Sequence, residues 1–507
     1  MKSRSLIVIA LFVIMAATCV PGQQPTPIRA QSGAKSNPAP ASGSGPFDKI
    51  WSVALNQFDQ SDQWGQSITQ LTNGTLVAAG ADGGYQRNSC RGFFGGAWVI
   101  AVTPGGNNVF QNLYSDCANA DQWANFVRAT PDGGFILSGE DDSMPFCQPC
   151  AWLAKFTSSG TIVWQEDLTS FFGSGVSVTP TSDGGYITAG FGQPNASSSI
   201  NGLIMKLSGT GASQWSKLFT ETAGSFAGAV VNNSGGLNFN SIVPTADGGY
   251  MLSGVADAQF SSGFAHVLVL MKIASAGSVQ WSRAYYSPTW GSWDPGSGLQ
   301  YPVSPTPDGG ATVSGTVQTL GSPFETLFLL MHVDSKGNVI WQKGYGGANG
   351  GFNRTDAVSA APTSDGGFIL AGYSDLFLQE WDGWLVKTDT FGNIQWQNLY
   401  SGTEPTGFNA VILNDVIQTA DGGYAAAGAS YVGSLSFGGP GFHILKTDAQ
   451  GNVGTCTSCS QPTHTSVQPL DMEAHDAIFN QANPALVFTT VNMKAKATSV
   501  TPKSLFP

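Results

Sequence analysis

Residues 132–139, Asp-Gly-Gly-Phe-Ile-Leu-Ser-Gly, decide the fold, because the same turn and apolar run recur along the chain. Glycine reaches positive φ without a Cβ clash and aspartate bonds to the local backbone, so each copy predicts a hairpin turn. The run that follows is apolar on both faces, as in a strand packed between two neighbouring sheets. The copies begin at residues 73, 132, 183, 247, 308, 365 and 421; the first reads Asn73-Gly-Thr, and in the fifth Ala311 replaces the aromatic residue.

A second motif follows each turn and predicts two further strands. It is clearest at 384–396, Trp-Leu-Val-Lys-Thr-Asp-Thr-Phe-Gly-Asn-Ile-Gln-Trp, which reads as a strand, a Gly-Asn turn and a strand that carries a tryptophan. With the strand before the Asp turn, each repeat has four strands, which we name a to d in chain order. Seven such repeats predict an all-β, seven-bladed β-propeller over residues 47–455. The aromatic residue of strand d recurs as Phe110, Trp164, Trp215, Trp281, Trp341 and Trp396.

The last repeat lacks a fourth strand of its own. Its tryptophan is expected near position 453, where Val453 stands instead. An extra copy of strand d precedes the first repeat, as Asp48-Lys-Ile-Trp51-Ser-Val-Ala-Leu55. We therefore expect the N-terminal strand with Trp51 to complete blade seven. Ring closure of this kind is expected to remove both sheet edges, which otherwise invite aggregation.

The repeats resemble a widespread group of secreted prokaryotic propellers with DGGY…AG and KTD..GN..W signatures, over roughly residues 48–455. This resemblance implies the fold and says almost nothing about function. The strand c–d motif is also similar to the tryptophan-docking repeat of pyrroloquinoline-quinone dehydrogenases, in which Asp, Gly and Trp come in the same order. Here the spacing is one residue shorter, the repeats number seven rather than eight, and there is no vicinal cysteine pair. We therefore expect no quinone cofactor.

The N-terminus has the pattern of an export signal. Lys2 and Arg4 precede an apolar run, Leu6–Ala17, that is too short to span a bilayer. Residues 1–20 are predicted to be a signal peptide, with Cys19 as an alternative site for a lipid anchor. Residues 21–46, rich in Pro, Ser and Gly, are predicted to be a disordered linker. The protein is then secreted or attached to the cell surface.

The remaining segments predict no transmembrane helix and one short extension. Residues 456–507 lack the repeat and form a C-terminal extension with one candidate strand at 481–491. Charged residues make up only 11% of the chain and the net charge is -12, which argues against a nucleic-acid partner.

Six cysteines follow the signal peptide, an even number that favours disulfides in an exported chain. Two Cys-x-x-Cys pairs also fit a zinc site. Strand order, however, places these two pairs toward opposite faces of the ring. We expect the pairs Cys90 with Cys117, Cys147 with Cys150, and Cys456 with Cys459.

The loops of such a ring lie on two faces. The a–b and c–d turns are short and share one face, whereas the long b–c and d–a connections share the other, where we expect the function. The richest loop spans 285–301, and its Trp290, Trp293 and Tyr301 are candidates to stack on a sugar or an apolar partner surface. Packing among the loops is the alternative for these rings.

Two other connections share the sequence Asp-Gln-Trp, at Asp62–Trp64 and Asp121–Trp123. This pair is either a structural echo of the repeat or a paired ligand contact through Trp64 and Trp123. Glu140, Asp141 and Asp142 form an acidic stretch that is a weak candidate for calcium, with a solvated loop as the favoured interpretation.

No catalytic motif stands out. His332 fills a place that lysine holds in other repeats, and His443 fills a tryptophan place. The sequence therefore favours a non-catalytic extracellular module that binds glycans or a protein partner, without a cofactor. The alternatives are a carbohydrate-active lyase or hydrolase with carboxylates near the central funnel, and a structural surface or adhesion protein.

Overall fold

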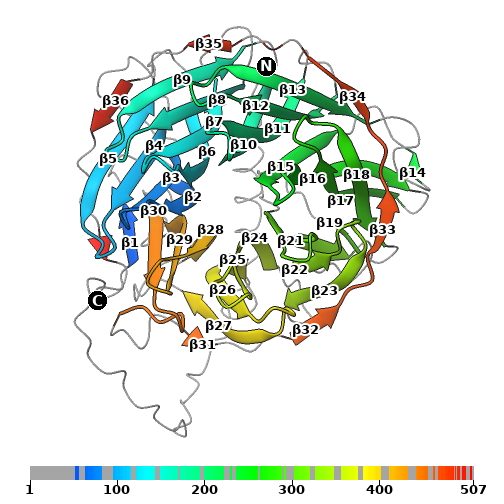
Figure 1. The fold of residues 1–507 in the computed structure, drawn as a ribbon. Coiled ribbons are helices and arrows are strands. Elements are labelled where there is room, and N and C mark those ends of the chain that lie inside the picture. The colour runs from blue at the N-terminus through cyan, green and yellow to red at the C-terminus, as the bar shows by residue number, and fades with distance from the viewer. Residues whose placement is uncertain are drawn as a thin grey trace, which may run out of the picture. The chain divides into compact units, whose positions relative to one another are not determined.

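A computed structural model of the protein shows a closed ring of antiparallel sheets (Figure 1). The structure describes residues 52–55, 63–82, 95–115, 122–142, 149–169, 172–193, 199–221, 229–230, 236–260, 263–287, 290–292, 302–319, 326–346, 355–374, 381–400, 410–431, 441–454, 461–462, 466–484, 486, 488–490, 494–497 and 503–504. In this part of the chain there is no helix, and hence none that is long and apolar enough to cross a membrane.

Seven blades of four strands each confirm the predicted propeller. Blade 1 holds β2 (Gln63–Gln70), β3 (Leu76–Asp82), β4 (Gly96–Val102) and β5 (Asn108–Ser115). Blade 2 holds β6 (Gln122–Ala129), β7 (Phe135–Asp141), β8 (Cys150–Phe156) and β9 (Ile162–Leu168). Blade 3 holds β10 (Phe172–Pro180), β11 (Tyr186–Gln193), β12 (Asn201–Leu207) and β13 (Ser213–Thr220).

The other four blades follow the same order of strands from the centre outward. Blade 4 holds β15 (Leu237–Pro244), β16 (Tyr250–Phe260), β17 (Gly263–Ile273) and β18 (Val279–Tyr286). Blade 5 holds β20 (Val303–Pro305), β21 (Ala311–Thr319), β22 (Thr326–Val333) and β23 (Val339–Gly346). Blade 6 holds β24 (Thr355–Pro362), β25 (Phe368–Ser374), β26 (Asp382–Thr388) and β27 (Ile394–Tyr400). Blade 7 holds β28 (Ala410–Gln418), β29 (Tyr424–Tyr431), β30 (Gly441–Thr447) and the N-terminal β1 (Ser52–Leu55).

The N-terminal strand closes the ring, as the sequence predicts. β1 pairs antiparallel with β30, with Val53 opposite Ile444. Val53 thus occupies, in blade 7, a place in strand d that the earlier blades fill from their own repeat. Val453, where the missing tryptophan was expected, is buried beside blade 7. Trp51 itself lies outside the described residues.

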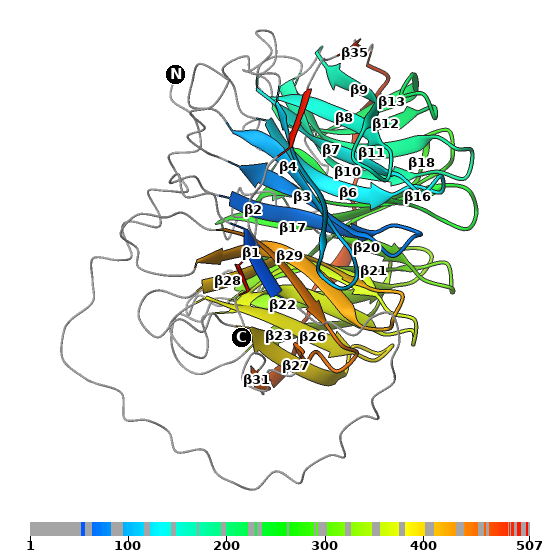
Figure 2. The same cartoon turned by 90° about the vertical axis from the view of Figure 1, so that its left-hand side faces the viewer.

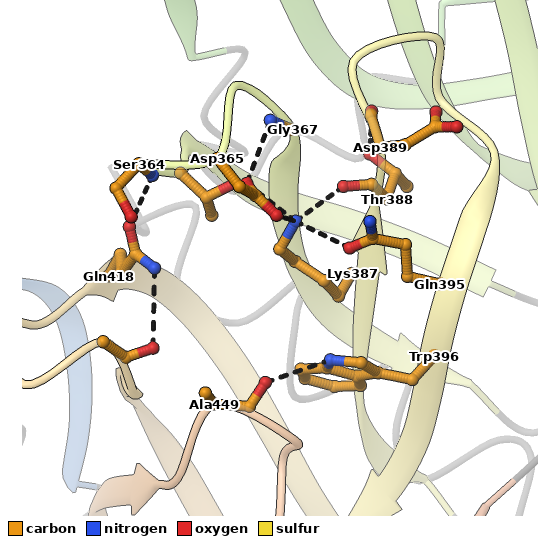
Figure 3. A network of polar contacts seen from close by, with 12 residues as sticks. Ser364, Asp365, Gly367, Lys387, Thr388, Asp389, Gln395, Trp396, Gln418 and Ala449 are labelled. Carbon is orange, nitrogen blue, oxygen red and sulfur yellow. Dashed lines mark hydrogen bonds and ion pairs between the residues drawn. The ribbon is translucent and has the colours of Figure 1, made fainter.

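The repeated turns are held by a buried basic residue from strand c. Figure 3 shows this in blade 6, where Lys387 Nζ bonds Asp365 at 2.8 Å, Thr388 O at 2.7 Å and Gln395 at 3.0 Å. His332 takes the lysine place in blade 5 and contacts Asp308, as its position in the repeat predicts. The same pairing joins Lys155 to Asp132, Lys206 to Asp183, Lys272 to Asp247 and Lys446 to Asp421.

The strand-d tryptophans join each blade to the next. Trp396 Nε1 donates to Ala449 O of blade 7 at 3.2 Å (Figure 3). The indole also packs against Gly451 of the same turn. Gly451 has φ +78°, a conformation that a glycine adopts without strain. Trp164 and Trp281 make the equivalent bonds to Gly209 O at 3.1 Å and Ser335 O at 2.9 Å.

The C-terminal extension runs around the outside of the ring (Figure 1). The sequence predicts one candidate strand there, whereas the structure has seven, and each pairs antiparallel with the outermost strand of a different blade. We call residues 461–504 the belt. Its strands are β31 (Gln461–Pro462), β32 (Ser466–Pro469), β33 (Glu473–Asp476), β34 (Asn480–Ala482), β35 (Phe488–Thr490), β36 (Lys494–Ala497) and β37 (Lys503–Ser504). They meet blades 6, 5, 4, 3, 2, 1 and 7 in that order.

One short strand joins blades 4 and 5 into one sheet, and a second extends blade 4 on its other side. β19 (Trp290–Ser292) lies in the loop at 285–301 that is rich in aromatic residues. It pairs with β17 on one side, where Ser292 is opposite His266, and with β21 on the other. β14 (Ala229–Val230) pairs with the far end of β16. The b–c hairpin of blade 4, whose strands have 11 residues each, therefore has extra strands on both sides.

Candidate functional site

Several predicted site residues lie outside the described residues, namely Asp62, Asp121, Trp293 and Tyr301. Trp290 begins β19, so its backbone position is known. Of the six cysteines predicted to pair, Cys150 alone is described; it is buried at the start of β8 and is disulfide-bonded. Cys90, Cys117, Cys147, Cys456 and Cys459 lie outside the described residues, so the pairings stay predictions.

The tryptophans of the two Asp-Gln-Trp motifs come together at the centre of the ring. Trp64 and Trp123 are the second residues of β2 and β6, the innermost strands of blades 1 and 2 (Figure 1). Their ring centroids lie 5.2 Å apart at an interplanar angle of 67°, an edge-to-face contact. Both side chains are only partly buried. Figure 2 shows the short turns together at one end of the strands. Trp64 and Trp123 lie at the start of strand a, whereas the short a–b turn follows its end. The pair is therefore on the face of the long b–c and d–a connections, which we call the variable-loop face.

The residue before each tryptophan anchors the pair to its blade. Gln63 Nε2 bonds Asp82 at 3.4 Å, and Gln122 Nε2 bonds Asp141 at 3.1 Å, across strands a and b of the same blade. Gln63, Gln122 and Asp141 are fully buried. The glutamine of the motif therefore has the same structural role in both blades, while the tryptophan is only partly buried.

A polar group lies beside the aromatic pair. The innermost strand of blade 2 has a bulge between Ala124 and Phe126. The side chain of Asn125, the residue in the bulge, bonds Glu140 at 3.3 Å and Ser174 of blade 3 at 3.0 Å. Burial raises the pKa of Glu140, although hydrogen bonds from Ser174 and Asn125 oppose the shift.

The acidic stretch is not the solvated loop that the sequence favours. Glu140 and Asp141 belong to β7, and Asp141 is buried with Gln122. The described residues contain no group of three or more side chains suited to a metal ion.

Charged residues link the inner strands of blades 2 and 7. Asp415 of blade 7 is buried and accepts hydrogen bonds from Ser359 at 2.7 Å and Ser67 at 2.8 Å. Arg128 of blade 2 reaches Asp415 at 3.8 Å and lies 4.0 Å over the ring of Phe126. Burial lowers the pKa of Arg128, an effect that Asp415 opposes. Asp415 therefore bridges the seam where the ring closes.

Sequence reasoning missed a second cluster, on blades 3 and 4. Asp257 Oδ1 lies 2.6 Å from His266 Nδ1, across β16 and β17. Glu221, directly after β13, has both carboxyl oxygens buried. Burial, with a contribution from Asp257, raises the pKa of Glu221 to about 8. The three residues come from two blades and form no local motif, although the hairpin register alone predicts that Asp257 is opposite His266.

No protein-family model and no curated protein matches the chain. Among solved structures, it is similar to a protein of unknown function from Dyadobacter fermentans DSM 18053, at 10% identity and a TM-score of 0.42, over 79% of this chain and 99% of that one. It is also similar to a chain of the mitotic checkpoint complex, at 8% identity and a TM-score of 0.38, over 83% of this chain and 99% of that one. A third similar structure is the polysaccharide lyase Uly1, at 9% identity and a TM-score of 0.40, over 83% of this chain and 94% of that one. At these values the likeness carries no argument about function.

Proposed function

We propose that the protein is a secreted or surface-attached propeller that binds a glycan, without cleaving it, at the innermost strands of blades 1 and 2 on the variable-loop face. The contact between Trp64 and Trp123 carries this proposal. Two partly exposed indoles on neighbouring blades offer apolar faces against which a sugar ring stacks.

The polar group beside the indoles supplies what a sugar needs in addition. Asn125 and Glu140, both partly exposed, present an amide and a carboxyl group, and the buried Ser174 hydroxyl holds Asn125 in place. Sugar hydroxyls both donate and accept, so a mixed set of this kind suits them. The rigid inner strands hold these groups in place before any ligand arrives, which reduces the entropic cost of binding.

A glycan array tests the proposal. We expect the purified protein to bind one class of glycans, and Trp64→Ala and Trp123→Ala each to weaken that binding at least about tenfold. The matched control is Phe391→Ala, because Phe391 is 66% exposed on the opposite, short-turn face. Binding that survives both tryptophan substitutions would remove the site, and a protein ligand captured in their place would favour the protein-partner alternative.

Export and disulfide pairing are part of the same proposal. They rest on the residues 1–20 pattern and on the even cysteine count. Intact-mass analysis of the mature protein tests both. Six free thiols or a bound zinc ion would contradict the pairing.

A carbohydrate-active enzyme is the second candidate, and the cluster around Glu221 favours it. Acid–base cleavage of a glycosidic bond needs one protonated carboxyl group as the acid and one carboxylate as the base or nucleophile. Glu221, which stays protonated at neutral pH, would be the acid and the neighbouring Asp257 the carboxylate. The test is release of reducing or unsaturated ends from the glycans found on the array. Cleavage that Glu221→Gln abolishes would establish the enzyme and overturn the non-catalytic proposal.

A further inference from the structure

The outermost propeller strand of each blade has an outer edge that closure of the ring does not cover. Closure pairs β1 with β30, but strand d of every blade still has an outward edge of unpaired N–H and C=O groups. The expectation that closure alone removes both edges is therefore wrong. The belt occupies these edges instead, with one short strand on each of the seven blades (Figure 1).

Apolar side chains of the belt insert at the seams between blades. Leu470 and Met472 are buried in the core that blades 4 and 5 share. Ala477 and Phe479 pack in the core of blades 3 and 4. Leu486 packs in the core of blades 2 and 3. The belt is thus part of the hydrophobic core as well as a set of added strands.

A repeated polar contact fixes the path of the belt. Gln342 donates to Met472 O at 2.9 Å, Ser216 donates to Pro484 O at 3.0 Å, and Ser282 donates to Ala477 O. Each donor is the residue directly after the strand-d tryptophan of its blade. All seven copies of strand d have glutamine or serine at this position, as Ser52, Gln111, Gln165, Ser216, Ser282, Gln342 and Gln397. At three of these seven positions the structure shows the side chain bonded to the belt.

The belt ends on the strand that closes the ring. β37 pairs with β1, with Ser504 opposite Val53 and Lys503 opposite Ala54. β1 is only four residues long and has no covalent link to blade 7 other than through the rest of the ring. The last strand of the belt therefore covers the strand that closes the propeller.

We propose that the belt is a strand donor in cis, which holds the ring closed and keeps its seven outer edges from pairing with a second copy of the chain. Open strand edges pair readily with any extended segment, and an identical chain offers the same edge and the same belt. A released belt would thus convert the rim into a surface for self-association.

Hydrogen exchange and size-exclusion chromatography with light scattering test the proposal in the full-length chain. We expect Leu470→Asp to speed amide exchange in β18 and β23 at least about tenfold and to produce dimers or larger assemblies. Ile478→Asp is the matched control, because Ile478 belongs to the belt but is 66% exposed; it should change neither property. Near-UV circular dichroism verifies that both variants keep the fold.

A second, milder variant keeps the test decisive if Leu470→Asp fails to fold. Ser282→Ala with Gln342→Ala removes two belt contacts without burying a charge and should show the same effects to a smaller degree. A synthetic peptide of residues 466–486 should return the variants to monomers, and a scrambled peptide should not. Unchanged exchange in Leu470→Asp, or faster exchange without any self-association, would overturn the proposal.

Discussion

The hydroxyl of Ser67 donates a hydrogen bond of 2.8 Å to the carboxylate of Asp415, across the seam between the first and last blades. The same carboxylate accepts the backbone amide of Ile68 at 2.9 Å and the hydroxyl of Ser359 at 2.7 Å. One buried side chain therefore joins blades 6, 7 and 1 at the inner edge, while the belt joins them at the outer edge.

Asp415→Ala should destabilise the protein by about 3 kcal/mol, because it leaves two buried hydroxyls and a backbone amide without their acceptor. Asp415→Asn keeps part of the network and should cost less. Urea unfolding followed by tryptophan fluorescence measures both. A loss below about 0.5 kcal/mol in the alanine variant would mean that this carboxylate does not hold the seam.

The turn aspartates predict a loss of stability in acid. Hydrogen bonds from Lys206 and Thr181 lower the pKa of Asp183 from its ordinary value of 3.8 to about 2. This stabilisation is complete above the ordinary pKa and is lost as the pH falls through the folded-state pKa. Lys206→Met removes the pair, so its melting temperature should fall less than that of the wild type between pH 4 and pH 2. Because Asp183 is half exposed, the difference should be modest, but parallel curves would contradict the assignment.

Glu221 predicts the opposite trend near neutrality. Its pKa rises from 4.5 to about 8 on folding, mainly because the group is buried. Between these values the unfolded chain ionises while the folded chain keeps the proton, so the folded state loses stability as the pH rises. Glu221→Gln should match the wild type at pH 4 and gain on it progressively up to pH 8. Thermal unfolding across this range would show a constant offset if the carboxyl group were solvated.

The docked tryptophan turns predict a contrast between two glycines. Gly451 and Gly422 have φ of +78° and +83°, so alanine is strained at both by about 1 kcal/mol. A Cβ on Gly451 would also lie 2.7 Å from Trp396, whereas a Cβ on Gly422 meets no atom within 4 Å. Gly451→Ala should therefore cost at least about 1 kcal/mol more than Gly422→Ala. Equal losses in denaturant unfolding would show that the indole does not need the close approach.

The architecture was predictable from sequence because its determinants are local and repeated. The Asp-Gly-Gly turns mark six of the seven blades, and the place where Val453 stands without a tryptophan points to β1 as the closing strand. The pairing of β1 with β30 confirms that inference. His332 and His443 lie opposite Thr312 and Gly428, the register places that the repeat assigns to them.

The belt was not predictable in the same way. Its strands have two to four residues each and take their order from the rim they pair with, so they carry no period of their own. The contact between Trp64 and Trp123 depends on how the ring brings neighbouring inner strands together. Glu221 meets Asp257 only because blades 3 and 4 pack side by side, and nothing local in the sequence records that.

The indole N–H resonances of a ¹⁵N-labelled protein test the proposed binding site most directly. On titration with the glycan selected by the array, the signals of Trp64 and Trp123 should shift together with a common dissociation constant. Those of the docked Trp164, Trp281 and Trp396 should stay in place, because their N–H groups are bonded to the next blade. Shifts confined to other tryptophans, with Trp64 and Trp123 unmoved at saturation, would contradict a binding site at this pair of indoles.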